Sequence, residues 1–194
     1  MAVGNRGGKE ERKGEIMGED RDEEKEGRGK EGVKEDGEKE REAADSLGFP
    51  FEIVSLDDAV AEEAVEGMVE DGFPRNGIQR VHDHALETIA ALDYDAVADG
   101  SRRDDRVPTV SRATAQSLED RHGIDYIAPL AGFGRHAVDD IVAASFEVET
   151  GPSEKIPKAD YEAELRAILA DRHGEDAVGD VFPDHEQTYV HDQQ

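Results

Sequence analysis

Residues 95–108 read DAVADGSRRDDRVP, and this stretch contains the features that decide the fold. The short apolar run Asp95–Asp99 predicts a strand, Gly100 permits a tight exit from it, and Pro108 directs the chain into the next helix. The residues between them, Ser101–Val107, form a polar loop at the carboxyl end of the strand. In α/β sheets ligands bind outside the carboxyl ends of the strands, so this loop is the first candidate site.

Similar strand signals alternate with helical patterns along the rest of the chain. Further strands are expected at Phe51–Leu56, Ile124–Leu130 and Phe146–Val148. Helices are expected from Asp57 or Asp58 to Gly72, over 77–92 after a cap at Asn76, over Ser111–Arg121 before Gly123, over Ala137–Ser145, and after a cap at Asp160. Their expected inward faces include Val60, Ala64, Val65, Met68, Ile78, Val81, Ala85, Ile89, Leu92, Val138, Ile141, Val142, Tyr161, Leu165, Ile168 and Leu169. Strands that alternate with helices of about ten to fifteen residues indicate an α/β fold with a parallel sheet.

The charge of the chain restricts its partners. Its 194 residues include 49 acidic and 23 basic residues, which gives a formal net charge of -26. This charge excludes an unaided electrostatic grip on DNA or RNA, because phosphates are repelled over most of the surface. The dense acidic surface, with almost no Lys after residue 43, is typical of a halophilic protein. Its self-repulsion is screened in concentrated salt, where the Debye length is about 3 Å at 1 M, so we expect the melting temperature to rise with KCl.

Composition also divides the chain into two parts. Residues 1–43 hold 15 acidic, 11 basic and nine Gly residues, with too few apolar side chains to offset the ordering entropy, so we expect disorder there. Residues 44–194 are the expected folded domain. The absence of Cys excludes disulfides, thiolate metal sites and a Cys nucleophile. Because there is no long apolar run and no signal core, we expect a soluble, cytoplasmic protein that does not bind membranes.

The loop after the second expected strand is the main candidate for ligand binding. Its members are Asp99, Gly100, Ser101, Arg102, Arg103, Asp104, Asp105 and Arg106. Arg binds phosphate or carboxylate through two parallel bonds, and neighbouring Asp residues can hold the Arg side chains or ligate Mg²⁺. The alternative is a solvated turn whose charges pair with one another, and such exposed pairs contribute only about 0–1 kcal/mol. The position at a strand end favours the functional interpretation.

Three further segments are secondary candidates for nucleotide or acceptor binding. They are Arg75 with Asn76, then Gly132, Gly134 and Arg135, and then Lys155 with Lys158. The first pair opens a helix, where the N-terminus favours anions, but Asn76 is at least as well explained as an ordinary cap. The glycines of the second group let a backbone approach a ligand, although glycine pairs also serve plain turns. The two lysines lie either in a mobile loop that reaches over the site or in a surface linker.

Familiar catalytic and metal-site patterns are missing from the sequence. His82 and His84 lie two apart on an expected helix and face different sides, so a zinc site is not supported. The sequence also lacks a serine nucleophile elbow and the motifs GxGxxG and GxxxxGK[ST]. We therefore assign no catalytic residue and no metal ligand.

Four long stretches together resemble one enzyme superfamily. They are LGFPFEIVSLDDAVAEEAVE (47–66), GFPRNGIQRVHDHALE (72–87), DAVADGSRRDDRVPTVSRATAQSLEDRHGIDYIAPLAGFGR (95–135) and EVETGPSEKIPKADYEAELRAIL (147–169). They look like an archaeal branch of the PP-loop superfamily, the N-type ATP pyrophosphatases or adenine nucleotide alpha hydrolases. That branch is similar to lysidine synthetases, tRNA thiolation enzymes and the ATPase domain of asparagine synthetase. The resemblance covers about residues 44–190.

The resemblance implies a Rossmann-like, doubly wound sheet that binds ATP with Mg²⁺ at its strand ends. It implies that an acceptor, either a tRNA base or another small molecule, is adenylated with release of pyrophosphate. In relatives, the loop equivalent to Asp99–Arg106 faces the nucleotide or the acceptor. The family's first-strand motif SGGxDS, which cradles the pyrophosphate, is absent, and Gly7-Gly8-Lys9-Glu10-Glu11 lacks both the preceding apolar strand and the Asp-Ser pair. We therefore expect the first strand to be missing or replaced and catalysis to be impaired.

Two other functions stay open at this point. One is a non-catalytic module of the universal-stress-protein type, which binds AMP or ATP without hydrolysis. The other is a partner-binding protein that uses no nucleotide. Loss of the first strand would also expose a sheet edge, for which we expect reduced stability or self-association into a homo-oligomer.

Overall fold

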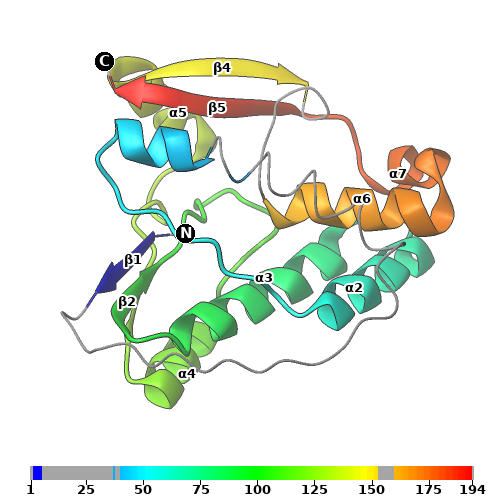
Figure 1. Cartoon of the computed structure of the whole chain (residues 1–194), viewed down its shortest axis with the longest axis horizontal. Coiled ribbons are helices and arrows are strands. Elements are labelled where there is room, and N and C mark those ends of the chain that lie inside the picture. Colours follow the sequence, from blue (N-terminus) through cyan, green and yellow to red (C-terminus); the bar gives the residue numbers. More distant parts are fainter. Residues whose placement is uncertain (1, 6–36, 38–39, 153–159, 194) are drawn as a thin grey trace, which may run out of the picture.

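The computed structural model describes residues 2–5, 37, 40–152 and 160–193, which form a mixed α/β fold (Figure 1). The helices are α2 (Asp58–Asp71), α3 (Arg75–Ala90), α4 (Arg112–His122), α5 (Arg135–Ser145), α6 (Tyr161–His173) and α7 (Glu175–Val181). The strands are β1 (Ala2–Asn5), β2 (Tyr94–Ala98), β3 (Asp125–Ile127), β4 (Phe146–Pro152) and β5 (Glu186–Gln193). Residues 40–46 are also helical. Within the described ranges, no helix is long and apolar enough to cross a bilayer.

Helices α2, α3, α6 and α7 pack around one apolar core. Helix α2 begins where the Asp57 side chain accepts a hydrogen bond from the N–H of Ala59, and it ends where Gly72 adopts a left-handed φ of 70°. The core between these helices comprises Ala64, Val65, Met68, Ile78, Val81, Leu165, Leu169, Val181 and Phe182. Within α2, α3 and α6 most of these residues lie three or four apart, which is the spacing of one buried helix face.

The strands β1, β2 and β3 form a three-stranded sheet in that order. Strands β2 and β3 are parallel, with Val97 opposite Tyr126, whereas β1 is antiparallel to β2, with Ala2 opposite Ala98. A second core joins α3 and α4 to this sheet and comprises Leu86, Ala90, Val97, Leu118 and Ile124. Because β2 and β3 are parallel neighbours, their carboxyl ends lie at the same edge of the sheet.

Helix α5 and the two-stranded sheet of β4 and β5 form a separate group of elements, at the top of Figure 1. The two strands are antiparallel and pair from Phe146 opposite Gln193 to Pro152 opposite Glu186. Helix α5 contacts β4 but has no buried residue, and Ile141 is 46% exposed. The expected burial of Ile141 is therefore wrong, because the described elements place no apolar layer over that side of α5.

Several expected elements are confirmed. Ser111 caps α4 and Gly123 ends it in a left-handed conformation, while Asp160 caps α6. Strand β2 matches Asp95–Asp99 to within one residue at each end. The expected short strand at Phe146–Val148 is present and extends to Pro152.

Other local expectations are wrong. Residues 51–57 form no strand: β2 already has a neighbour on each side, and Ile53 is 53% exposed. Pro74, not Asn76, precedes α3, and the amide of Asn76 instead donates to Asp71 at 2.8 Å. Strand β3 ends at Ile127, where the expected strand continued to Leu130. The chain turns there, and the N–H of Ala131 donates to the carbonyl of Ala128.

Only parts of the N-terminal segment are described by the structure. Residues 2–5 form strand β1 and residues 40–43 are helical, whereas residues 1, 6–36, 38 and 39 lie outside the described part, so the expected disorder stays a prediction. Strand β1 pairs with β2 along the edge that we expected to be open.

Candidate functional site

Two loops meet at the carboxyl ends of β2 and β3. We call Asp99–Arg106 the arginine loop and Pro129–Arg135 the glycine loop. The N–H of Arg103 donates to the carbonyl of Phe133 at 2.9 Å. The Asp104 carboxylate accepts the N–H of Arg135 at 2.9 and 3.0 Å. The structure thus brings together two segments that the sequence places about thirty residues apart.

Gly134 lies close to the side chains of the arginine loop. A Cβ atom at this position would lie 3.0 Å from Nη2 of Arg103 and 3.1 Å from Oδ2 of Asp104. With any larger residue here, these two side chains would have to shift by a few tenths of an ångström. A Cβ at Gly132, by contrast, would meet nothing within 4 Å.

Arg102 and Asp105 hold the arginine loop in shape. The Arg102 guanidinium donates to Oδ1 of Asp105 through Nε at 3.0 Å and through Nη2 at 2.5 Å, and the Arg102 N–H donates to Oδ2 at 2.7 Å. The hydrogen bond to Asp105 raises the pKa of Arg102, although partial burial opposes this. Both side chains are thereby engaged within the loop, and their predicted contact with a ligand stays a prediction.

The negatively charged carboxylate of Asp104 lies at the first turn of α5. The backbone N–H of Arg135 and the nearby arginines hold the pKa of Asp104 below its usual range. Because a helix N-terminus favours a negative charge, this carboxylate occupies the place that a phosphate would otherwise take. We therefore expect a ligand phosphate to bind to the arginine side chains of the two loops and not to the N-terminus of α5.

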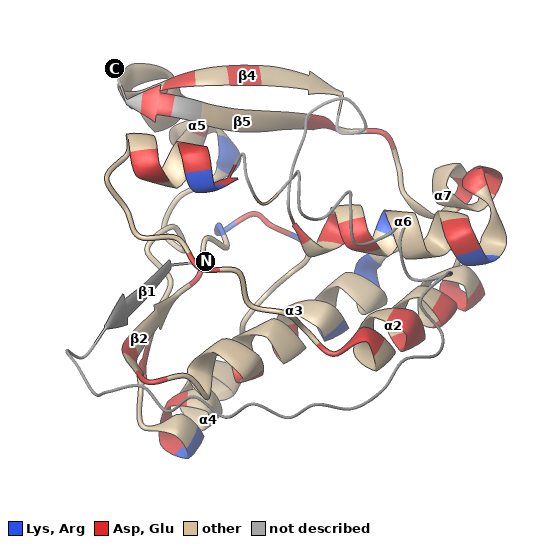
Figure 2. Cartoon of the chain, viewed as in Figure 1, with Lys and Arg blue, Asp and Glu red and all other residues tan. Residues whose placement is uncertain are grey.

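Three arginines of the two loops are exposed. They are Arg103, Arg106 and Arg135. Arg103 makes only a long hydrogen bond of 3.4 Å to the carbonyl of Gly132, and Nε of Arg135 lies 3.7 Å from Asp139. Figure 2 shows basic residues in the loop after β2 and acidic residues along α2. The three arginines are exposed basic side chains of two joined loops on an otherwise acidic chain, and we call these three residues the arginine patch.

Asp99 lies beneath the patch and is buried, with an exposure of 4%. Its Oδ1 accepts the N–H of Ser101 at 2.6 Å and the Ser101 hydroxyl at 2.8 Å. Its Oδ2 accepts from Nε2 of His82 and from the hydroxyl of Tyr126, both at 3.0 Å. Burial opposes ionisation of Asp99, but the hydrogen bonds from His82 and Ser101 outweigh it and hold the pKa well below its usual range. Asp99 and Ser101 therefore hold the start of the loop in place, and their predicted contact with a ligand stays a prediction.

His82, Tyr126 and Tyr161 were not identified as site residues from the sequence. His82 is 3% exposed, and its Nδ1 lies 3.3 Å from the hydroxyl of Tyr161 on α6. Burial raises the pKa of both Tyr126 and Tyr161, and nearby carboxylates raise it further. A signal for His82 was present, because it lies four residues after Ile78 and three before Ala85 on the buried face of α3.

The remaining candidates lie elsewhere. Arg75 and Asn76 are exposed in the first turn of α3. Lys155 and Lys158 lie outside the described residues. Gly100 is exposed and leads out of β2 as expected.

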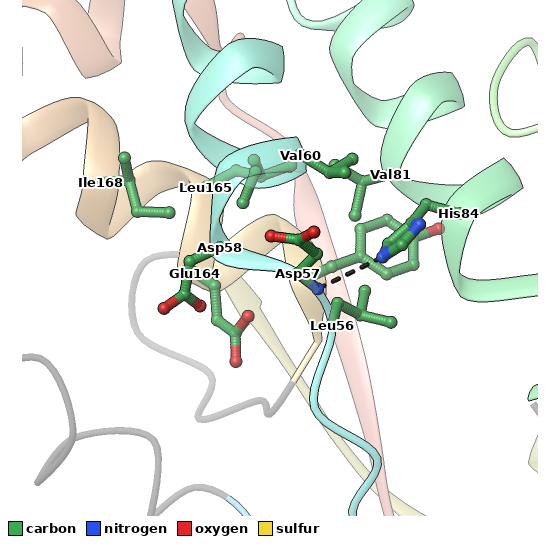
Figure 3. A pocket seen from close by; sticks show the side chains of 11 residues that line it. Leu56, Asp57, Asp58, Val60, Val81, His84, Glu164, Leu165 and Ile168 are labelled. Atoms are coloured by element: carbon green, nitrogen blue, oxygen red, sulfur yellow. Dashed lines mark hydrogen bonds between the residues drawn. The ribbon is translucent and has the colours of Figure 1, made fainter. Parts of the chain in front are cut away.

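A small cavity of about 50 Å³ lies between α2, α3 and α6 (Figure 3). Its lining includes Asp58, His84, Tyr161 and Glu164, and Nε2 of His84 accepts the N–H of Asp57 at 3.2 Å. This volume admits water but no nucleotide. Among the residues that the structure describes, no group of three His, Cys, Asp or Glu side chains is arranged to hold a metal ion.

Comparison with known proteins gives relatives but no established activity. A protein described as "Uncharacterized protein MJ0690" from Methanocaldococcus jannaschii is 43% identical over 149 residues, which cover 77% of this chain and 73% of that protein. A solved structure, titled as the crystal structure of a predicted subunit of tRNA methyltransferase from Methanocaldococcus jannaschii, matches with a TM-score of 0.70 and 40% identity. That match covers 79% of this chain and 76% of the solved chain. The profile described as "Family of unknown function (DUF7411)" matches residues 28–192, so the chain belongs to the DUF7411 family.

Proposed function

We propose that the strand-end site binds the phosphates of an adenine nucleotide, ATP or AMP. One observation carries this proposal: hydrogen bonds join the arginine loop to the glycine loop, and Arg103, Arg106 and Arg135 of these two loops are exposed. Arginine is the residue best suited to phosphate, because its planar group donates several bonds at once. In a chain of net charge -26, such a patch can attract an anion only locally.

We further propose that the protein is of the PP-loop ATP pyrophosphatase type and acts in the cytoplasm. The resemblance of four sequence stretches supports this, together with parallel strands whose loops meet at one edge, as in a Rossmann-like, doubly wound sheet. By that resemblance the nucleotide would adenylate an acceptor and release pyrophosphate. The segment Gly7–Glu11, which stands where the phosphate-binding motif is expected, lies outside the described residues.

The residues present fit nucleotide phosphates better than a protein-held metal ion. The oxygens of Asp99 accept four hydrogen bonds, and Asp104 and Asp105 are engaged by Arg135 and Arg102. Their carboxylates are therefore not free to ligate Mg²⁺, which would have to arrive with the nucleotide and screen its phosphates. Because the conserved cradle of the superfamily is missing from the sequence, we expect binding with little or no pyrophosphate release.

The test is a calorimetric titration of the full chain with ATP and with AMP in concentrated KCl, beside an assay of pyrophosphate release. Each charge-assisted phosphate contact is worth about 1.5–3 kcal/mol, so replacing Arg103 or Arg135 by Ala should weaken ATP binding about tenfold or more. Arg80→Ala is the matched control, because Arg80 is an exposed arginine that pairs with Glu63 away from the loops. No heat of ATP binding at millimolar concentration would refute the proposal. Binding without pyrophosphate release would favour the module of the universal-stress-protein type.

A second candidate function is that of a subunit in a tRNA-modifying complex. The solved structure that is 40% identical supports it, because its title calls that protein a predicted subunit of tRNA methyltransferase. The net charge argues against broad contact of this chain with tRNA, so any such contact would be confined to the arginine patch or made by a partner protein. Fluorescence anisotropy with unmodified tRNA distinguishes the two candidates: tRNA binding with no response to ATP would favour the second.

A further inference from the structure

A chain of buried hydrogen bonds links helix α6 to the arginine loop. The hydroxyl of Tyr161 on α6 lies 3.3 Å from Nδ1 of His82 on α3, and Nε2 of His82 lies 3.0 Å from Oδ2 of Asp99. Asp99 in turn accepts the N–H and the hydroxyl of Ser101, the second residue after it in the loop. The chain thus joins α6 to the loop through residues separated by up to 79 positions.

The direction of each hydrogen bond follows from the chemistry of the partners. An ionised carboxylate can only accept, so His82 donates from Nε2 to Asp99. In a neutral ring Nδ1 is then the acceptor for the phenol hydroxyl of Tyr161. Loss of that phenol would leave a buried ring nitrogen without its partner, and the ring orientation that serves Asp99 would be less restricted.

We propose that Tyr161 and His82 are positioning residues that hold the arginine loop, through Asp99, in the conformation that binds an anion. The ligand part of this inference rests on the proposed nucleotide function, whereas the coupling of α6 to the loop stands on the geometry alone. Tyr161 acts through His82 and touches no ligand itself.

The test uses Tyr161→Phe in the full chain, with Tyr94→Phe as the matched control. Tyr94 also gives its hydroxyl to a carboxylate, that of Glu52 at 2.8 Å, but this bond lies on the surface. Hydrogen–deuterium exchange is measured at the amides of Ser101, Arg102 and Arg103, and ATP affinity is measured by calorimetry. For one lost buried hydrogen bond we expect loop exchange to be about fivefold faster in Tyr161→Phe and unchanged in Tyr94→Phe. ATP affinity should fall by a similar factor.

A second variant separates positioning from general weakening. In His82→Gln the side-chain amide can still donate to Asp99 but the link to Tyr161 is lost, so its effect should match that of Tyr161→Phe. The two changes together should then cause no further increase in exchange, because they break the same chain. Three results would each overturn the inference. They are equal loop exchange in Tyr161→Phe and in the control, additive effects in the double variant, and a uniform rise in exchange that includes α2. A wild-type chain that binds no ATP would refute the nucleotide function alone, since loop exchange still decides the coupling.

Discussion

Two histidine–carboxylate pairs, each with one member on α3, have nearly the same length but very different surroundings. Nε2 of His82 lies 3.0 Å from Asp99, and both side chains are 4% exposed. Nε2 of His122 lies 2.9 Å from Glu87, but these side chains are 22% and 39% exposed. If one residue of the first pair is replaced, its partner stays buried without a hydrogen bond. If one residue of the second pair is replaced, its partner can still bond to water. Burial, not distance, should therefore decide the cost of breaking each pair.

The largest effect is expected for Asp99→Ala. The change leaves His82, Tyr126 and Ser101 without their shared acceptor, and breaking a buried pair in this way costs about 3–5 kcal/mol. Urea unfolding in concentrated KCl measures the loss of stability. Asp125→Ala, on the exposed side of β3, is the control and should change stability by less than about 0.5 kcal/mol.

The pH dependence of the buried pair has a defined sign. The folded pKa of Asp99 is lowered, so its stabilisation is fully present above the unfolded pKa of about 3.9 and is lost as the pH falls below that value. The stability difference between wild type and Asp99→Asn should therefore narrow as the pH is taken from 6 to 3. A difference that stays constant over this range would contradict the assignment of Asp99 as an ionised anchor.

A smaller effect is expected where apolar side chains of α3 pack against α2. A Cβ at Gly77 would collide with the side chain of Met68 and would lie 2.8 Å from the carbonyl oxygen of Ala64. Gly77→Ala should therefore cost about 1–3 kcal/mol through overpacking. Gly67→Ala is the opposite control, because nothing lies within 4 Å of its Cβ, and it should stabilise α2 by about 0.5–1 kcal/mol. Equal shifts in melting temperature for the two variants would contradict the close packing of α2 on α3.

The sequence predicted elements whose signals are local. The caps at Asp57 and Asp160 and the stops at Gly72 and Gly123 are each determined by residues within one helical turn. The run Phe51–Leu56 misled the prediction, because an apolar stretch can pack as an irregular segment when no strand edge receives it. The sides of α5 were likewise assigned from periodicity, which does not reveal whether another layer covers them.

The sequence located the two loops at the strand ends but not the contacts between them. In the structure these loops are joined by hydrogen bonds. The sequence could not show that Asp104 binds the backbone of Arg135, 31 residues away, or that His82 binds Asp99, 17 residues away. Such pairings depend on the tertiary arrangement, and they decide which charges anchor a loop and which remain for a ligand.

The smallest effect is expected for the exposed pair of Glu87. Partial burial opposes its ionisation, but hydrogen bonds from His122 and Arg121 outweigh this and lower its pKa. Glu87→Gln removes the ion pairs with His122 and Arg121 and also removes one negative charge. The loss of a negative charge by itself should favour folding of so acidic a chain. Glu70→Gln, on the exposed surface of α2, measures that general charge effect and is the proper reference.

Relative to Glu70→Gln, we expect Glu87→Gln to lower stability by less than about 1 kcal/mol near pH 7. Because the folded pKa of Glu87 lies below the unfolded value of about 4.3, this difference should be present above that pH and disappear as the pH falls through it. Added KCl should also reduce the stability difference between Glu87→Gln and Glu70→Gln, because Glu87 and its partners are open to solvent. The stability lost in Asp99→Ala should hardly change with KCl. A loss for Glu87→Gln as large as that for Asp99→Ala would show that burial is not what separates the two pairs.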